Sequence, residues 1–286
     1  MTPLCVAGLQ LALDAHADNS ERIAARIAHT VAHYPFVRLV LVSELATFGA
    51  SPRFAQPLPG SVEASYAALA REHGIWLIPG TLFEQADDGR VYNTASVIDP
   101  SGAVVARYRK LFPFRPYEEG VEAGDACCVF DVPQLGRVGL SICYDLWFPE
   151  TTRTLAAMGA EVILHPVMTT TIDRDVEIAM TRAMAAMNQC FIVSVNGAGA
   201  GGNGRSVVCG PTGDLLVHAG ETEQIIPIEL DLDVVRRGRE LGLWGLGQPL
   251  KSFRDRKIDF SVYRKGAPGF DALHALGPLR KQTRED

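Results

Sequence analysis

Short apolar runs alternate with amphipathic segments along most of the chain. Residues 6–11 and 36–42 are apolar runs of strand length, and the segment between them places Ile23, Ile27 and Val31 on one face of a helix. A strand, a helix and a second strand in this order are the unit from which parallel sheets are built. The beginning of the chain therefore predicts a β-α-β unit.

Turn signals follow a second predicted helix. Residues 62–73 are amphipathic and stop at Gly74, a typical residue just beyond a helix end, and residues 75–83 form the next predicted strand. The sequences Asp-Asp-Gly at 87–89 and Asp-Pro-Ser-Gly at 99–102 then separate further apolar runs, as turns between hairpin strands do. Because hairpin strands are antiparallel, the predicted sheet is mixed.

The same rhythm returns in the second half of the chain. Three apolar runs alternate there with two helical patterns, in the order 138–142, 150–158, 162–165, 175–188 and 191–195. Hairpin strands follow, and we predict one domain over residues 1–262 with an irregular C-terminal arm over residues 263–286. Two similar halves with added hairpins predict an α/β fold of four layers, in which two mixed sheets lie face to face between helices.

Composition excludes several classes of function. The chain has 286 residues, of which 47% are hydrophobic and 21% charged, as in a folded globular protein. Its net charge of −6 comes without a long basic run, so we expect neither a nucleic acid nor a membrane surface as partner. No apolar run is long enough to span a bilayer, and the first residues lack the basic segment of a secretion signal. We therefore expect a cytoplasmic protein that acts on a small molecule.

Cysteine is the first candidate nucleophile. The chain contains six cysteines without CxxC spacing, so neither a zinc site nor a disulfide framework is indicated, and we expect no metal and no cofactor. Cys143 follows an apolar strand that breaks sharply into a predicted helix. Such a turn exposes the thiol and leaves backbone N–H groups unpaired, which suits an oxyanion.

Two charged residues follow other apolar strands. Glu44 comes directly after the run at 36–42, and Lys110 comes after a predicted hairpin strand. Either residue by itself is typical of a protein surface. Together with Cys143 they form a chemical set, because a carboxylate takes the proton of a thiol, and an ammonium lowers the thiol pKa and stabilises charge on a carbonyl oxygen.

The segments around these residues resemble the three signatures of the nitrilase superfamily of carbon-nitrogen hydrolases. They are Leu-Val-Ser-Glu44-Leu, Tyr-Arg-Lys110-Leu-Phe-Pro and Gly-Leu-Ser-Ile-Cys143-Tyr-Asp, in the order and at the wide spacing of that family. The resemblance extends over about residues 4–260. It implies an αββα sandwich that forms homodimers or larger homo-oligomers, with Glu44 as general base, Lys110 as oxyanion stabiliser and Cys143 as nucleophile.

Many members of this family carry a second glutamate after the lysine. Glu118 and Glu119 are both candidates here, and Glu118 lies eight residues beyond Lys110, a spacing similar to that of the aliphatic amidase and formamidase branch. We therefore choose Glu118 as the residue that orients Lys110 and the amide nitrogen of the substrate.

The resemblance to the amidase branch is incomplete. Tyr144-Asp145 follow the cysteine, where nitrilases typically have Trp-Glu, and this favours an amidase. Phe114-Arg115 stand where aliphatic amidases have Trp-Cys or similar residues, and the long C-terminal extension of that branch is missing. The natural substrate is therefore left open by the resemblance.

We expect an amidase that hydrolyses a small aliphatic or ω-carboxamide to a carboxylic acid and ammonia through a cysteine thioester. The backbone N–H of Tyr144 is expected to hold the oxyanion together with Lys110. Candidate substrate contacts are Arg115, Tyr117, Trp147 and Pro166. Alternatives are hydrolysis of N-carbamoyl amino acids or amines, for which Arg115 binds a carboxylate, hydrolysis of nitriles, acyl transfer to an amine, and a non-catalytic interaction role.

Two further patterns compete with this interpretation. Residues 197–202 satisfy GxGxxG, but they lead into another predicted strand instead of a helix, so we expect no dinucleotide site. His165 lies at the end of a predicted strand and is the rival base for a papain-like pair with Cys143.

Overall fold

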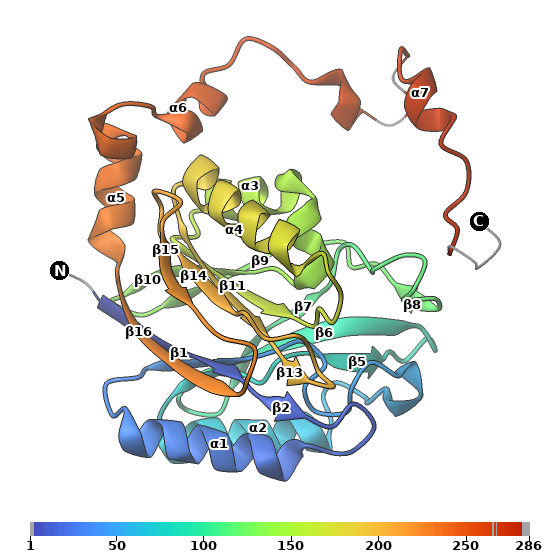
Figure 1. The fold of residues 1–286 in the computed structure, drawn as a ribbon, viewed down its shortest axis with the longest axis vertical. Coiled ribbons are helices and arrows are strands. Elements are labelled where there is room, and N and C mark those ends of the chain that lie inside the picture. The colour runs from blue at the N-terminus through green and yellow to red at the C-terminus, as the bar shows by residue number, and fades with distance from the viewer. Residues whose placement is uncertain (1–2, 265, 267, 282–286) are drawn as a thin grey trace.

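Four layers make up the protein, whose computed structural model describes residues 3–264, 266 and 268–281. Two β-sheets lie face to face, with α1 and α2 on the outer face of one sheet and α3 and α4 on the outer face of the other (Figure 1). The bounds of these helices are Ser20–His33, Ser61–His73, Pro149–Ala157 and Arg174–Asn188. The predicted αββα arrangement is confirmed.

The first sheet contains the opening β-α-β unit. Within the described residues its strand order is β16 (Gln224–Asp231), β1 (Pro3–Gln10), β3 (Leu39–Val42), β4 (Trp76–Ile78), β6 (Val91–Ile98) and β5 (Leu82–Gln85), and β6 also pairs with β7 (Val104–Arg109) and β8 (Val121–Glu122). β1, β3 and β4 are parallel, whereas β16, β5 and β7 are antiparallel to their partners. The sheet is mixed, as the turn signals predict.

The second sheet repeats this organisation. Its strand order within the described residues is β15 (Leu215–His218), β14 (Val207–Cys209), β12 (Phe191–Asn196), β11 (Val162–Val167), β10 (Gly136–Leu140) and β9 (Cys128–Val132). β10, β11 and β12 are parallel, and the outer strands are antiparallel. A separate short pair joins β2 (Ala12–Leu13) to β13 (Ala198–Gly199).

Apolar side chains fill the three interfaces between the layers. Leu41 of β3 and Leu140 of β10 belong to the cluster between the two sheets. Ile23 and Ile27 of α1 pack on the outer face of the first sheet, and Ile178 of α4 packs on that of the second. Each fully buried side chain of this size contributes about 1.5–3 kcal/mol relative to its exposed state, so hydrophobic burial holds the layers together.

Residues 75–83 form two strands, β4 and β5, where the pattern predicts one. Pro79 has no N–H to donate to a sheet, and Gly80 has a φ of +85°. Gly80 also packs so closely that a Cβ at this position would lie 2.1 Å from the Ser43 carbonyl oxygen, so only glycine fits. The chain therefore turns here, directly against the segment that follows β3.

The C-terminal part of the chain departs from the pattern prediction. β16 crosses back to the first sheet and pairs with β1, where the pattern predicts only a further hairpin strand. After it come the helices α5 (Leu232–Leu241), α6 (Pro249–Arg254) and α7 (Asp271–His274), and the pattern predicts none of them. The end of the described chain returns beside the loop before β8 (Figure 1). Within the predicted arm, residues 265, 267 and 282–286 lie outside the described residues, and the domain boundary at 262 stays a prediction.

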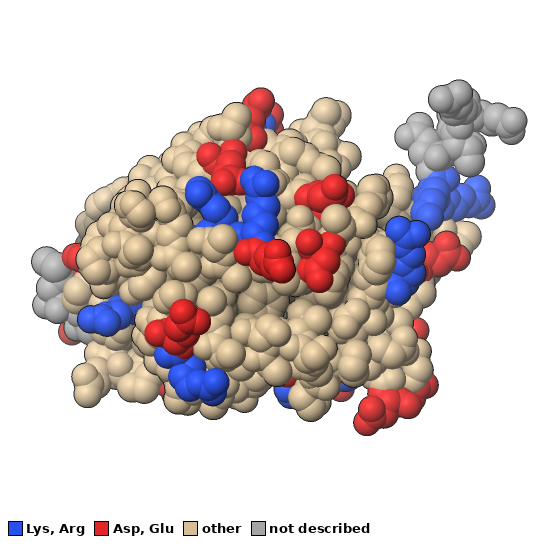
Figure 2. All heavy atoms as spheres, turned by 90° about the horizontal axis from the view of Figure 1, so that it is seen from below, with Lys and Arg blue, Asp and Glu red and all other residues tan. Residues whose placement is uncertain are grey.

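Charged side chains of both signs occur on the face of the molecule drawn in Figure 2. On the face seen from below, lysine and arginine side chains are interspersed with aspartate and glutamate and do not gather into a continuous positive surface (Figure 2). Among the described residues, none of the helices combines the length and apolar character needed to cross a bilayer.

Candidate active site

Three strands of the sandwich end at one pocket. Glu44 follows β3, Lys110 follows β7, and Cys143 follows β10, so the residues come from both sheets. The Lys110 Nζ atom lies 2.9 Å from Glu44 Oε1, and Cys143 lines the same pocket as these two residues. The structure therefore brings the predicted acid, ammonium and thiol together, although 66 residues separate the first two along the chain.

The turn around Glu44 is held from two sides. The Glu44 N–H donates to the Val167 carbonyl at 3.2 Å, which ties the end of β3 to the end of β11 in the other sheet. The next residue, Leu45, has a φ of +50°, and its N–H donates to Thr81 Oγ1 at 2.9 Å. Thr81 follows the Pro79-Gly80 turn, so the break between β4 and β5 helps to fix the position of the Glu44 side chain.

Cys143 stands in a strained backbone position at the start of a 3-10 helix (Cys143–Trp147). Its φ of +43° is unusual for a residue other than glycine and costs about 1–3 kcal/mol, which the surroundings must offset. The buried carboxylate of Asp145 does so, because it accepts hydrogen bonds from the N–H of Ile142 at 2.9 Å and of Phe112 at 2.8 Å. It also accepts one from the Tyr108 hydroxyl at 2.7 Å. Asp145 thus locks the cysteine turn to the segment that carries Lys110, a role that the motif itself does not reveal.

Lys110 lies between two carboxylates. Its Nζ donates to Glu118 Oε2 at 2.9 Å, at the same distance as to Glu44. Asn93 of β6 connects the two acids from behind, because its Nδ2 donates to Glu44 Oε1 at 2.8 Å and to Glu118 Oε1 at 3.1 Å. The sequence patterns do not single out Asn93; the available signal is a buried amide in a strand whose other polar side chains are the hydroxyls of Tyr92, Thr94 and Ser96. Of the two candidate second glutamates, Glu118 contacts Lys110, whereas the Glu119 side chain is 87% exposed at the rim.

Replacing Asn93 with leucine is expected to lower kcat about 10- to 100-fold, because both carboxylates then lose a donor that holds them at the ammonium. Steady-state kinetics of ammonia release measures this effect. The matched control is Thr94→Val, which removes a buried hydrogen bond to Glu84 from the neighbouring position of the same strand. An equal loss in both variants would contradict a specific role for Asn93.

Burial and mutual charge set the protonation states at this site. Burial raises the pKa of the Glu44 carboxyl, and Lys110 opposes this rise without cancelling it. Burial and the Glu44 charge raise the pKa of the Cys143 thiol well above its ordinary value, against the lowering effect of Lys110. Burial alone lowers the pKa of Lys110, but Glu44, Cys143 and Glu118 outweigh burial and raise it. At neutral pH the site therefore holds an ammonium, a protonated thiol and, in Glu44, a carboxyl group more basic than an exposed one.

These polar groups lie in a pocket of about 240 Å³. Its walls are mainly apolar and are formed by Leu45, Ala50, Pro52, Phe83, Phe114, Tyr117 and Met168. Phe114 and Tyr117 stack with their ring centroids 5.1 Å apart. Because pockets for drug-sized ligands usually measure about 300–1,000 Å³, this one suits a smaller molecule with a short apolar part.

Of the four predicted substrate contacts, one lines the pocket and three do not. Tyr117 lines the pocket and is largely exposed. Arg115, Trp147 and Pro166 do not belong to its described lining. The Arg115 guanidinium instead donates to the carbonyls of Glu118 and Val121 and so closes the loop on itself. A carboxylate clamp by Arg115 therefore requires these bonds to break.

Tyr144 is the second residue of the 3-10 helix after Cys143, where a backbone N–H has no partner inside the helix. Its ring packs edge-on against Phe114 at 5.0 Å. This position is the one expected of a backbone donor beside the nucleophile.

His165 does not form a pair with Cys143. Its Nδ1 lies 3.1 Å from the Ser141 carbonyl oxygen, and the residue does not belong to the described pocket lining. Burial, followed by the nearby charge of Arg174, lowers the pKa of His165 to about 3, so the imidazole is neutral. Among the described residues, no group of three or more His, Cys, Asp or Glu side chains is arranged to hold a metal ion.

The four-layer fold and the buried acid, ammonium and thiol at one pocket define the nitrilase-like class of proteins. A family model described as carbon-nitrogen hydrolase matches residues 6–240, and the chain belongs to this family of enzymes. The chain is 30% identical over 233 residues to the human omega-amidase NIT2. This match covers 76% of the present chain and 80% of NIT2.

Two solved structures extend the comparison. Nit3 from Saccharomyces cerevisiae, a member of branch 10 of the nitrilase superfamily, has a TM-score of 0.76 at 26% identity over 84% of this chain and 94% of its own. A cysteine-to-alanine mutant of the amidase from Nesterenkonia sp. AN1, in complex with butyramide, has a TM-score of 0.70 and 25% identity. This match covers 83% of the present chain and 94% of the Nesterenkonia chain. The resemblance to the nitrilase superfamily is confirmed, and the protein is a carbon-nitrogen hydrolase whose relatives are amidases.

Proposed function

We propose that this enzyme is an amidase that hydrolyses small, uncharged aliphatic amides to a carboxylic acid and ammonia through a thioester on Cys143. The observation that carries the proposal is the buried Lys110 ammonium, 2.9 Å from both Glu44 and Glu118, in the pocket that Cys143 lines. A buried ammonium between two acids beside a thiol provides a base, a nucleophile and a donor for an oxyanion at one point.

Acylation begins with the proton of the thiol. Glu44 takes this proton while the Cys143 sulfur attacks the amide carbonyl carbon, and the Lys110 ammonium and the Tyr144 N–H hold the resulting oxyanion. When the tetrahedral intermediate collapses, the carbon-nitrogen bond breaks and Glu44 returns the proton to the nitrogen, which leaves as ammonia. Glu118 orients Lys110 throughout, since it accepts a hydrogen bond from Nζ together with Glu44.

Deacylation repeats these steps with water. Glu44 takes a proton from water as the oxygen adds to the thioester carbonyl, and the same donors hold the second oxyanion. Collapse breaks the carbon-sulfur bond, releases the carboxylic acid and leaves a thiolate that recovers its proton from Glu44. The cycle consumes one amide and one water and requires no further reactant.

The charges on the pocket wall favour an uncharged substrate. Its described lining includes the glutamates 44, 118 and 119, and the one positive side chain among these residues, Lys110, is already paired with two of them. Among these lining residues a substrate carboxylate finds no unpaired cation, and at the rim it meets Glu119, which lies 4.0 Å from the Lys281 ammonium. The ω-amidase relative therefore does not set the substrate of this enzyme, and the short amide bound by the Nesterenkonia amidase is the better guide.

Ammonia release across a substrate panel tests the proposal. We expect kcat/KM for butyramide to exceed that for glutaric acid monoamide, a matched ω-carboxamide with an added carboxylate, by at least about 10-fold. N-carbamoyl amino acids and aliphatic nitriles complete the panel. A preference for any of these three classes over butyramide would contradict the proposed substrate, and no ammonia from any compound would contradict the proposed reaction. Sedimentation of the same preparation tests the predicted homo-oligomer.

A further inference from the structure

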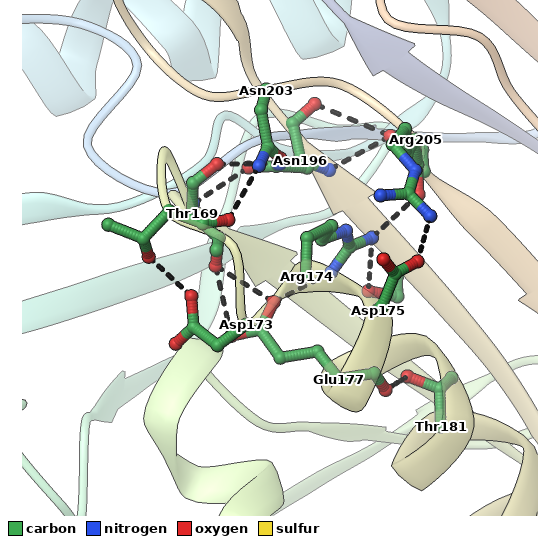
Figure 3. A network of polar contacts seen from close by, with 12 residues as sticks. Thr169, Asp173, Arg174, Asp175, Glu177, Thr181, Asn196, Asn203 and Arg205 are labelled. Atoms are coloured by element: carbon green, nitrogen blue, oxygen red, sulfur yellow. Dashed lines mark hydrogen bonds and ion pairs between the residues drawn. The ribbon is translucent and has the colours of Figure 1, made fainter.

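A buried polar network lies behind the pocket, between the second sheet and the start of α4 (Figure 3). Its charged members are Arg174 and Glu177, whose side chains are only 1% and 6% exposed. Arg174 donates to Glu177 Oε2 at 3.0 Å and to the Arg205 carbonyl at 3.0 Å. The reaction described above does not use this buried pair. Because unpaired buried charges are strongly unfavourable, the pair needs a structural or functional reason.

Thr169 connects the network to the pocket. Its hydroxyl donates to the Glu177 carboxylate, with distances of 2.9 and 2.8 Å to the two oxygens. Its backbone is held by a single amide side chain, because the Thr169 N–H donates to Asn196 Oδ1 at 2.9 Å and the Thr169 carbonyl accepts from Asn196 Nδ2 at 3.0 Å. The residue is therefore fixed through its side chain and both of its backbone groups.

The residue before Thr169 faces the nucleophile. Met168 lines the pocket together with Cys143, and its backbone N–H acts on the Cys143 sulfur in the direction that lowers the thiol pKa. The carbonyl of the same peptide unit, that of Val167, accepts the N–H of Glu44 at 3.2 Å. Because a peptide unit is planar and its N–H and C=O point in opposite directions, this one unit bridges the base and the nucleophile.

We propose that Thr169 is a positioning residue of the reaction, which holds the peptide between Val167 and Met168 so that the Met168 N–H points at the Cys143 sulfur. This donor stabilises the negative charge on sulfur while the thiol proton moves to Glu44, since a hydrogen bond to the charged form favours that form. Arg174 supports the same arrangement, because its positive charge offsets the negative charge of the Glu177 carboxylate behind Cys143. The inference deepens the proposed function and rests on it for the role of Cys143.

Three variants test this role. Thr169→Val keeps the shape and removes the hydroxyl, Thr169→Ser keeps the hydroxyl, and Thr181→Val is the control. Thr181 is also buried, and its hydroxyl donates to the backbone carbonyl of Glu177 at 2.7 Å, away from the pocket. For each variant, the rate of Cys143 alkylation by iodoacetamide is measured against pH, together with kcat and KM for butyramide and the melting temperature.

Thr169→Val is expected to move the midpoint of alkylation upward by about one pH unit and to lower kcat about tenfold with little change in KM. Thr169→Ser restores both values, and Thr181→Val resembles the unchanged enzyme. Wild-type alkylation behaviour in Thr169→Val would overturn the inference, even if that variant melts earlier, and so would an equal effect in Thr181→Val. Because alkylation requires no substrate, this result is separable from a failure of the proposed amidase activity, which shows as missing ammonia release in the unchanged enzyme.

Discussion

Replacing Cys143 with alanine is expected to abolish ammonia release from every amide in the panel and to leave the fold intact. The thioester scheme has no other nucleophile, because the bond to the acyl group forms at the Cys143 sulfur. The fold is retained because the strained turn at this residue is held mainly by the buried Asp145 carboxylate, which accepts hydrogen bonds from the N–H groups of Ile142 and Phe112. Residual catalysis by the remaining donors is not expected to be detectable beside the unchanged enzyme.

The measurement combines ammonia release with mass spectrometry of the protein during turnover. The unchanged enzyme is expected to gain the mass of the acyl group, and Cys143→Ala is not. Cys127→Ala is the matched control, because Cys127 is also a free, half-buried thiol but packs under the second sheet. Turnover by Cys143→Ala, or an acyl adduct at another residue, would show that the covalent scheme is wrong.

Replacing Lys110 with alanine is expected to lower kcat by more than the roughly 10²- to 10³-fold that loss of one oxyanion donor usually costs. Lys110 also neutralises Glu44 and Glu118, which both contact its ammonium at 2.9 Å. Without this cation, two carboxylates face each other in a buried site, and the charge of Glu118 raises the pKa of Glu44 further. Burial already raises the Glu44 pKa, so the variant needs a higher pH than the unchanged enzyme to form the carboxylate that accepts the thiol proton.

The pH dependence of kcat separates the loss of the oxyanion donor from the rise of the Glu44 pKa. A further raised Glu44 pKa means that the base forms at higher pH, so the residual kcat of Lys110→Ala is expected to keep rising with pH where the kcat of the unchanged enzyme no longer does. Lys251→Ala is the control, since Lys251 lies on α6 and donates to a backbone carbonyl. A variant that keeps a tenth or more of the activity would contradict the role given to Lys110.

The three motif residues could be predicted because each one interrupts a regular pattern. Glu44 and Lys110 are charges placed where an apolar strand ends, and Cys143 occupies the end of a strand that breaks into a helix. Glu44 and Cys143 each follow a parallel strand, at the carboxyl edge where α/β sheets place functional residues, whereas Lys110 follows the antiparallel strand β7. The packing of the two sheets against each other brings these ends together. Their order along the chain then carries the family resemblance.

The supporting residues could not be predicted in this way. Asn93, Asp145 and Thr169 are polar residues of ordinary types, and their partners come from distant segments or from backbone groups. A hydrogen bond depends on the approach of two atoms within a few tenths of an ångström, and neither hydrophobic period nor local spacing determines that approach. The same limit explains why Arg115, chosen as a substrate contact, instead bonds to the carbonyls of its own loop.

The sequence by itself determined the β-α-β rhythm, the mixed sheets, the four layers and the three chemical groups at strand ends. These features follow from local periodicity and from the residue types that regular structure disfavours. Only the tertiary structure decided that β16 returns to the first sheet, that Asn93 joins the two acids, and that one peptide unit connects Glu44 to Cys143. The physical reason is that these contacts join segments far apart in the chain, whose distances are set by strand pairing within the first sheet and by the packing of the two sheets against each other.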